Sequence, residues 1–146
     1  MKVFFEIVSK PSAYLLKNKT PYSSEELDRL ISFYSHSVTT TVRHIGVPRT
    51  QILPPSKICF VGLGFKFRPD RKRSYFISPI PGVFLDLPLL GDERELTGKT
   101  EEEVYMVLKN TSSVPFTLKA GPSYFILTSE YKRPFKIELE KPEKRT

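Results

Sequence analysis

The sequence is poor in the residues that form covalent or metal cross-links. Cys59 is the single cysteine among 146 residues, which excludes a disulfide within the chain. The apolar run around it, "ICFVGL", favours a buried thiol over a nucleophile. His36 and His44 are the two histidines, and no Cys/His spacing is typical of a zinc site. We therefore expect no metal and no cofactor, and an intracellular, reducing setting.

Long apolar runs are also missing. The N-terminal stretch "MKVFFEIVSK" is too short in its apolar part for a signal peptide, and it alternates like a strand. No stretch is long enough to span a membrane, so we expect no membrane partner. Internal repeats and low-complexity tracts are absent. A chain of 146 residues can bury a core without disulfides or metal. We expect a single domain over residues 1–140 and a charged tail over 141–146.

Proline and basic residues are abundant. The 13 prolines and 7 glycines interrupt the chain often and favour many short strands. The net charge is +7, from 23 Lys and Arg against 16 Asp and Glu, which favours attraction to nucleic acid or acidic surfaces. The densest basic cluster lies in "KFRPDRKR" and contains Arg68, Arg71, Lys72 and Arg73. It is either a solvated loop or a patch for nuclear import or nucleic-acid binding.

One helix is predicted, over about residues 24–35. Ser23 and Glu26 have the spacing of a capping box. Apolar side chains then recur at i, i+3, i+4 and i+7, the spacing of one helix face: Leu27, Leu30, Ile31 and Tyr34. This stripe either packs on the body of the domain or is displayed to a partner.

The rest of the chain has strand composition. About eight strands are predicted, at residues 2–8, 37–45, 57–69, 74–78, 83–87, 102–110, on both sides of a turn at 119–122, and at 134–140. Short strands at regular spacing indicate an all-β sandwich, barrel or jelly roll. The turn predicts a hairpin or a strand-to-strand connection. The bulky Tyr124, Phe125 and Ile126 that follow it are either core residues or fill a place where another protein keeps polar groups.

Four segments between about residues 50 and 128 resemble trimeric dUTPases in their order and spacing. They are "QILPPSKICFVGLGFKF", "YFISPIPG", "LLGDERELTGKTEEEVYMVLKN" and "TSSVPFTLKAGPSYFIL". The resemblance implies a jelly-roll β-barrel with one inserted short helix near the N-terminus. In that family three subunits share the active sites, and a C-terminal arm crosses between them.

The chemistry of the family requires several groups at once. A carboxylate activates the attacking water, and an aromatic ring packs under the deoxyribose. An Arg–Ser pair grips the phosphates, an Asp positions magnesium, and a glycine-rich arm closes the site. Matched to this pattern, Glu93 stands at the position of the base, with Asp92 beside it. Leu96 stands where the ring would be, and Gly98 is the retained glycine.

The phosphate motif and the metal carboxylate depart further from the family. Pro79 and Gly82 match it, whereas Ile80 and Pro81 replace the Arg–Ser pair. Ser123 and Ile126 replace an arginine and a glutamine. We find no counterpart of the metal-positioning Asp, and the C-terminal tail has no glycine. We therefore predict that the chain has no catalytic residues and is a degenerate, inactive relative.

Three functions follow, in order of preference. The first is a non-enzymatic viral protein of this fold, in the host cytoplasm or nucleus, that binds a host or viral protein. Its candidate interaction surface combines the basic cluster with the helix stripe. The second is a nucleotide or single-stranded nucleic-acid binder, supported by aromatic residues such as Phe65, Phe67, Tyr75 and Phe76 beside basic residues. Strand alternation puts about half of these rings in the core, which weakens this interpretation. The third is an active divergent dUTPase using Asp92 or Glu93. We expect a departure from the family trimer, because the helix would cover the old interface.

Overall fold

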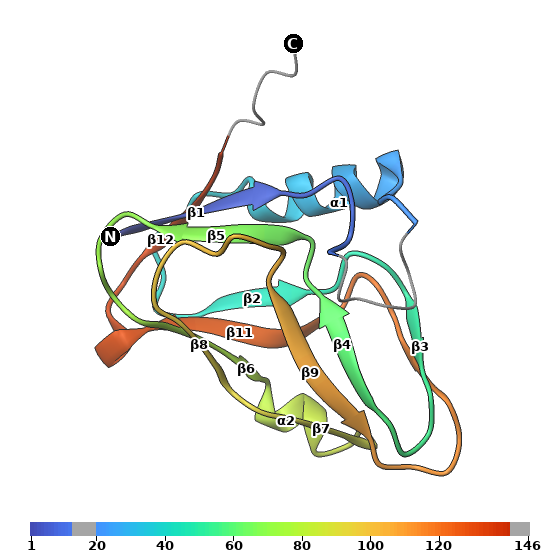
Figure 1. The fold of residues 1–146 in the computed structure, drawn as a ribbon. Helices are drawn as coiled ribbons and strands as arrows, with labels where there is room; N and C mark the ends of the chain where they lie inside the picture. The colour runs from blue at the N-terminus through green and yellow to red at the C-terminus, as the bar shows by residue number, and fades with distance from the viewer. Residues whose placement is uncertain (13–19, 141–146) are drawn as a thin grey trace.

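Short strands are the commonest elements of the computed structural model, which describes residues 1–12 and 20–140 (Figure 1). The predicted tail at 141–146 lies outside the described residues. In chain order the strands are β1 (Lys2–Ile7), β2 (Arg43–Gly46), β3 (Gln51–Leu53), β4 (Ile58–Gly62), β5 (Phe65–Pro69), β6 (Tyr75–Pro79), β7 (Leu89–Gly91), β8 (Arg94–Leu96), β9 (Tyr105–Asn110), β10 (Phe116–Leu118), β11 (Ser123–Ser129) and β12 (Lys136–Leu139). The helical segments are α1 (Ser24–Tyr34), α2 (Pro81–Phe84) and the 3-10 turn η1 (Glu130–Lys132).

The strands form small sheets that wrap around one core. Their orders are β12-β1-β5, β10-β3, β2-β11-β6-β8 and β4-β9-β7. β1 and β12, from opposite ends of the chain, pair in parallel, and the other paired strands run antiparallel. This arrangement is a jelly-roll-like β fold with few helices, so the predicted fold class is confirmed. Among the described residues, no helix has both the length and the apolar character needed to cross a bilayer.

The predicted helix is confirmed, and it ends at Tyr34. The Ser23 hydroxyl accepts a hydrogen bond from the Glu26 backbone N–H (3.1 Å), and the Glu26 carboxylate accepts one from the Ser23 N–H (2.8 Å). This reciprocal capping box satisfies two backbone donors that a helix start leaves unpaired. The helix lies along β1 (Figure 1) and buries Leu30 and Tyr34.

Aromatic rings fill the centre of the core under this helix. The rings of Phe5 and Phe65 stack at 3.8 Å, and the Tyr34 ring meets Phe5 edge-on at 5.1 Å. The Tyr75 ring lies edge-on to Phe67 and to Phe135, at 5.4 and 5.5 Å. The edge-on arrangements are favourable beyond the area that they bury.

The predicted long strand at 57–69 is two strands, because the chain bends at Gly64. Gly64 has φ +84°, a left-handed conformation that glycine adopts without steric cost. A Cβ at this position would lie 2.6 Å from Leu30 Cδ1, so glycine also admits the close approach of α1. The bend sends β4 and β5 into different sheets.

Three further strand predictions need correction. Residues 83–87 form no strand: Val83 and Phe84 are the last two residues of α2, whose first residue is a proline with φ already suited to a helix start, and 85–87 form the turn after it. Residues 37–45 pair as a strand only from Arg43, and before it Thr40 makes an isolated bridge with Phe135. For the turn at 119–122 the predicted strand-to-strand connection is confirmed and only the hairpin alternative is wrong, because β10 pairs with β3 while β11 pairs with β2 and β6.

Candidate functional site

The segments that resemble dUTPase motifs come together around Pro79 within one chain. Phe125 on β11 is directly opposite Pro79 on β6, and the Ile80 N–H donates to the Tyr124 carbonyl at 2.9 Å. A Cβ built on Gly91 would lie 3.1 Å from Pro79 Cγ, so the end of β7 also contacts this place. The structure therefore brings the segments 79–82, 91–93 and 123–126 close to one another.

The side chains that meet at this place are apolar. The Phe84 ring, on α2, lies 6.0 Å from the Phe125 ring, and Phe125 is fully buried. Tyr124 is buried as well, and its hydroxyl accepts a hydrogen bond from the Lys119 N–H at 3.2 Å. Tyr124 and Phe125 are core residues, and Ile126 is half-buried. Ile80 and Pro81 add a helix cap and a first turn but no side-chain donor.

Asp92 and Glu93 differ from these buried apolar side chains. Both are exposed in the two-residue connection between β7 and β8. The next residue, Arg94, turns its guanidinium over the Tyr105 ring at 3.9 Å and donates to the Tyr105 carbonyl at 2.7 Å. Leu96 is buried in the core opposite Tyr75, so it contributes nothing to an open site.

Two glycines that matched the dUTPase-like pattern, Gly82 and Gly98, are not required by packing. A Cβ at Gly82 or at Gly98 would meet nothing within 4 Å. Among the described residues, no three His, Cys, Asp or Glu side chains gather closely enough to hold a metal ion. Within the part of the chain that the structure describes, the contact around Pro79 is apolar, and the side chains of Ile80 and Pro81 offer no hydrogen-bond donor.

The predicted interaction surface is only partly exposed. Leu30 and Tyr34 are buried against the sheet of β1 and β5, so including them was wrong, while Ile31 is exposed and Leu27 is half-buried. The stripe faces inward because the buried edge of α1 must cover the aromatic core.

Arg68 also differs from the expected free basic residue. Its guanidinium donates to the Glu140 carboxylate and lies 4.2 Å from the centre of the Phe4 ring. Arg71 and Lys72 are exposed, and Arg73 is half-buried. The basic cluster thus splits into one paired arginine and three cations at the loop between β5 and β6.

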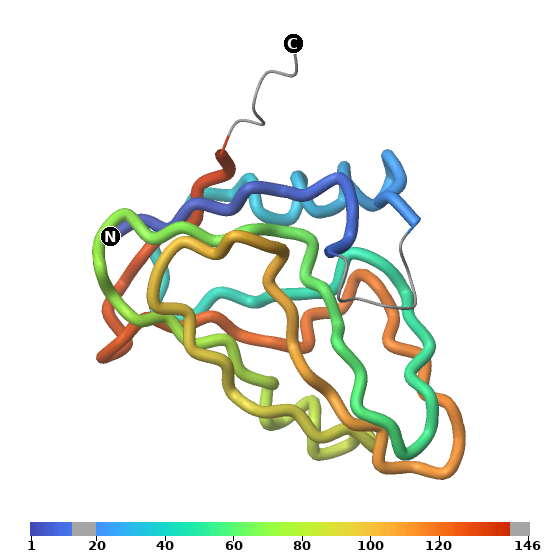
Figure 2. The backbone as a smooth tube through the Cα atoms, viewed as in Figure 1, coloured from blue at the N-terminus to red at the C-terminus, as the bar shows by residue number. Residues whose placement is uncertain are grey.

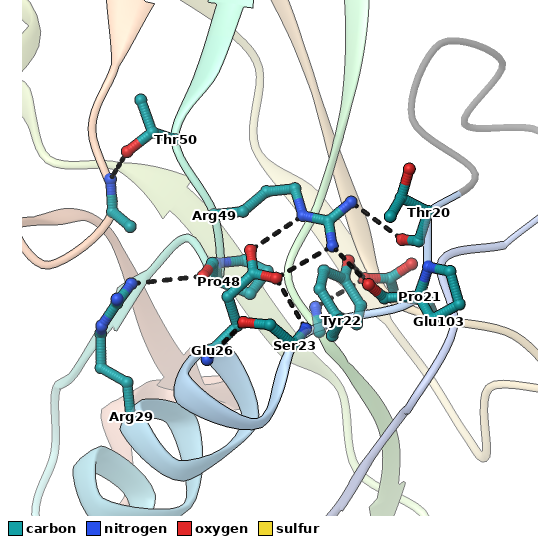
Figure 3. Close-up of polar contacts among 12 residues, drawn as sticks. Thr20, Pro21, Tyr22, Ser23, Glu26, Arg29, Pro48, Arg49, Thr50 and Glu103 are labelled. Carbon is teal, nitrogen blue, oxygen red and sulfur yellow. Dashed lines mark hydrogen bonds and ion pairs between the residues drawn. The ribbon is translucent and has the colours of Figure 1, made fainter.

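The structure contains a polar cluster that sequence reasoning missed, centred on Glu103 (Figure 3). Glu103 is only 2% exposed. Its carboxylate accepts hydrogen bonds from the Gly64 N–H (2.7 Å), from the Ser12 N–H (3.2 Å) and from the Tyr22 hydroxyl. The Glu103 N–H returns a hydrogen bond to the Ser12 hydroxyl at 3.2 Å. One side chain therefore joins the segment before α1 to the bend between β4 and β5.

Arg49 extends the same cluster to the start of α1 (Figure 3). Its guanidinium makes two hydrogen bonds to the Glu26 carboxylate, at 2.9 and 3.0 Å, and two more to the carbonyls of Thr20 and Pro21. It also lies 4.6 Å from the centre of the Tyr22 ring. We call the set Tyr22, Glu26, Arg49 and Glu103 the tether.

The pKa values of the tether follow from burial and partners. Burial raises the pKa of the Glu103 carboxyl, against the opposing effect of its hydrogen bonds. Burial, with Glu103 adding to it, also raises the pKa of Tyr22. The hydrogen bond from Arg49 lowers the pKa of Glu26. A buried acid with a shifted pKa can mark a catalytic site, but here the chain's own donors surround the carboxylate, so we assign it a structural role.

The sequence carried a weak signal for this cluster. Glu103 is the last of three consecutive glutamates, and nothing local distinguishes it from Glu101 and Glu102. Glu26 was identified through the capping box, whereas its second partner, Arg49, is 23 residues away. Pairings over such distances are made by the fold.

Comparisons with solved structures relate the fold to phage dUTPases. A mutant dUTPase from phage phi11 of S. aureus matches with TM-score 0.57 and 11% sequence identity, covering 72% of this chain and 84% of that chain. A mutant dUTPase of Staphylococcus bacteriophage 80alpha matches with TM-score 0.56 and 11% identity, covering 72% and 79%. No protein-family model matches the sequence, and no curated protein does. The likeness shows a dUTPase-like fold.

Proposed function

We propose that this chain is a non-enzymatic protein of the dUTPase-like fold that acts by binding another protein through its outer surface. The packing around Pro79, where the dUTPase-like segments meet, supports the non-enzymatic part of the proposal. Phe84 and Phe125 pack there, and Ile80 and Pro81 present no phosphate donor. Losing a positioned general base costs roughly two to four powers of ten in rate, and losing transition-state donors costs roughly two to three more.

The outer face of the β4-β9-β7 sheet supports the second part of the proposal, which is binding to another protein. Alternate residues of these strands point outward, and several are large and apolar: Ile58, Phe60, Leu90 and Val107. Phe60 is 49% and Ile58 65% exposed. Phe60 and Val107 are direct cross-strand partners, so they form a continuous surface. Contiguous apolar surface of this kind is typical of protein-binding sites.

Charge around this face indicates the kind of partner. The exposed Lys109 lies between Ile58 and Leu90 in the strand register, and Lys57 precedes Ile58. An apolar centre with lysines beside it complements a protein surface that has an apolar patch and acidic residues at its edge. We propose that such a protein, a viral or host protein within the infected cell, binds this face, and that further copies of this chain do not.

A regulatory use of this fold has a parallel among the structural neighbours. The bacteriophage 80alpha dUTPase controls transfer of virulence genes by a proto-oncogenic G protein-like mechanism. This parallel supports a signalling or regulatory role for a protein that shares the fold.

The first experiment tests for hydrolysis. We expect no release of pyrophosphate when the protein is incubated with dUTP and magnesium. Turnover that Asp92→Ala or Glu93→Ala abolishes would overturn the non-enzymatic half of the proposal.

The second experiment tests the sheet face. The double variant Phe60→Asp, Val107→Asp is compared with wild type as bait in affinity capture, and each captured protein is purified and its affinity remeasured. Ile52→Asp is the matched control, because Ile52 is exposed on β3, outside this face. We expect a partner that binds wild type and Ile52→Asp and is lost from the double variant. Equal binding to all three, or a light-scattering mass showing that the face is covered by other copies, would contradict the proposal.

A further inference from the structure

The turn after β11 holds a tyrosine in an unusual backbone conformation. Tyr131 and Lys132 have φ of 57° and 51°, the left-handed region that residues with a Cβ rarely adopt. The Tyr131 side chain is 82% exposed. Its ring therefore gains little burial in return for this strain. Strain of this kind persists where the surroundings impose it, and it is often found at functional sites.

Hydrogen bonds fix this turn against the loop between β5 and β6. The Glu130 N–H donates to the Ser74 carbonyl at 2.8 Å, and the Ser129 hydroxyl donates to the Arg133 carbonyl at 2.5 Å. Ser129 and Tyr75 are directly paired across β11 and β6. Figure 2 shows these two connections, the loop between β5 and β6 and the turn after β11, at the same end of the molecule, away from β4 and β9. The strand pairing thus brings the basic loop beside the turn.

The two connections together carry a concentration of positive charge. We call it the Tyr131 patch, which consists of Arg71, Lys72, Arg73, Tyr131, Lys132 and Arg133. Within residues 1–12 and 20–140, none of its five cations forms an ion pair. The nearby Asp70 carboxylate accepts the Lys2 N–H at 3.0 Å. Only Asp70 and Glu130 oppose the five cations in these two connections.

We infer that the Tyr131 patch binds single-stranded nucleic acid. Unpaired Lys and Arg side chains neutralise phosphates, and an exposed aromatic ring stacks on a base of any identity. A duplex keeps its bases stacked on one another, and an acidic peptide has no base to stack. The combination of free cations with one ring in solvent therefore favours a single strand over both.

This site differs from the one that the sequence suggested. Phe65, Phe67 and Tyr75 are fully buried, so stacking on them was a wrong expectation, and Phe76 is half-buried. Tyr131 was not singled out because a lone tyrosine between charged residues has no distinctive pattern. Its exposure and its proximity to the loop at 71–73 come from the pairing of β11 with β6.

The test measures binding of the full chain to a fluorescein-labelled oligothymidylate of about 20 nucleotides by fluorescence anisotropy. Tyr131→Ala is expected to weaken binding about tenfold, whereas Tyr131→Phe, which keeps the ring, stays within about twofold of wild type. The triple variant Arg71→Gln, Lys72→Gln, Arg73→Gln is expected to lower the slope of log affinity against log salt by about 2 between roughly 50 and 200 mM salt.

A charge-matched control separates the patch from general attraction. The variant Lys10→Gln, Arg29→Gln, Lys119→Gln removes the same charge from exposed cations outside both the patch and the β4-β9-β7 face, and it should keep near wild-type affinity and salt slope. Equal losses in the two triple variants would overturn the inference. So would unchanged binding by Tyr131→Ala, equal affinity for duplex DNA, or displacement of the oligonucleotide by polyglutamate as effective as by unlabelled oligothymidylate.

Discussion

Two regions of the molecule combine a tyrosine with several charged side chains. In the tether, Tyr22 and Glu103 are buried, and hydrogen bonds from the chain itself occupy the carboxylate. In the Tyr131 patch the ring is in solvent, and the five cations form no ion pair within the described residues. The side chains of the tether join the segment before α1 to the bend at Gly64, whereas a backbone hydrogen bond from Glu130 to Ser74 joins the two segments of the patch.

The difference teaches where charge can act on a ligand. A buried charge must be matched by the fold, because leaving it unmatched costs several kcal/mol. The groups that match this charge then stabilise the fold and are not available to a ligand. An exposed cation contributes little to stability and keeps its charge for an incoming phosphate. Stability and binding should therefore respond to different substitutions.

The largest expected effect is the loss of stability in Glu103→Ala. The change leaves the Gly64 N–H and the Tyr22 hydroxyl without their buried acceptor, and we expect the free energy of unfolding to fall by about 3 kcal/mol. Urea unfolding measures it. Glu102→Ala is the control, since Glu102 is exposed, and it should change stability by less than about 0.5 kcal/mol. Similar losses in both variants would mean that Glu103 is not a tether.

The second prediction concerns pH. Burial raises the pKa of Glu103 in the folded state, so above its unfolded pKa the folded protein binds more protons there than the unfolded chain does. Stability from this group is greatest at acid pH and falls as pH rises through the raised pKa. Glu26 has the opposite sign, because its lowered pKa makes its contribution disappear as pH falls.

Unfolding of wild type and Glu103→Gln across this pH range isolates the Glu103 contribution. The difference in stability between the two proteins should shift in favour of the variant as pH rises above the ordinary glutamate range. A difference that stays constant with pH would show that Glu103 has the same pKa in the folded and unfolded states.

The smallest expected effect is a change in stability on substitution of Tyr131, and it tests whether this ring supports the fold. Glycine adopts the left-handed conformation of Tyr131 without steric cost, so Tyr131→Gly should raise the free energy of unfolding by about 0.5 kcal/mol, after the greater freedom of glycine in the unfolded chain is counted. Tyr131→Ala keeps a Cβ and should give no gain. A clear destabilisation by Tyr131→Gly would mean that the ring supports the fold, and the patch would lose its distinction from the tether.

Local pattern predicted some elements well, and particular residues show why. The capping box at Ser23 and the apolar spacing of Leu27 to Tyr34 predicted α1, because both depend on neighbours within one or two turns. Alternation predicted β1, β9 and β12. The strand at 83–87 failed, because apolar residues after Pro81 satisfy a short helix as readily as a strand.

Sites were harder to predict than elements. Sequence matching brought Pro79, Asp92 and Phe125 to attention, and they lie in segments that the structure places together. Sequence matching could not distinguish Arg68, whose guanidinium pairs with the Glu140 carboxylate, from Arg71 and Lys72, which are exposed. It also could not find Glu103, since burial of one glutamate in a run of three depends on what packs over it.

By itself the sequence determined the all-β class, the single capped helix, the excess of positive charge and the side chains without a hydrogen-bond donor at Ile80 and Pro81. These properties depend on composition or on residues close in the chain. Only the tertiary structure decided that β1 pairs with β12, that Glu103 meets Tyr22, and that the loop at 71–73 lies beside Tyr131. Such contacts join distant parts of the chain, and they form because the whole core is buried together, which no short segment specifies.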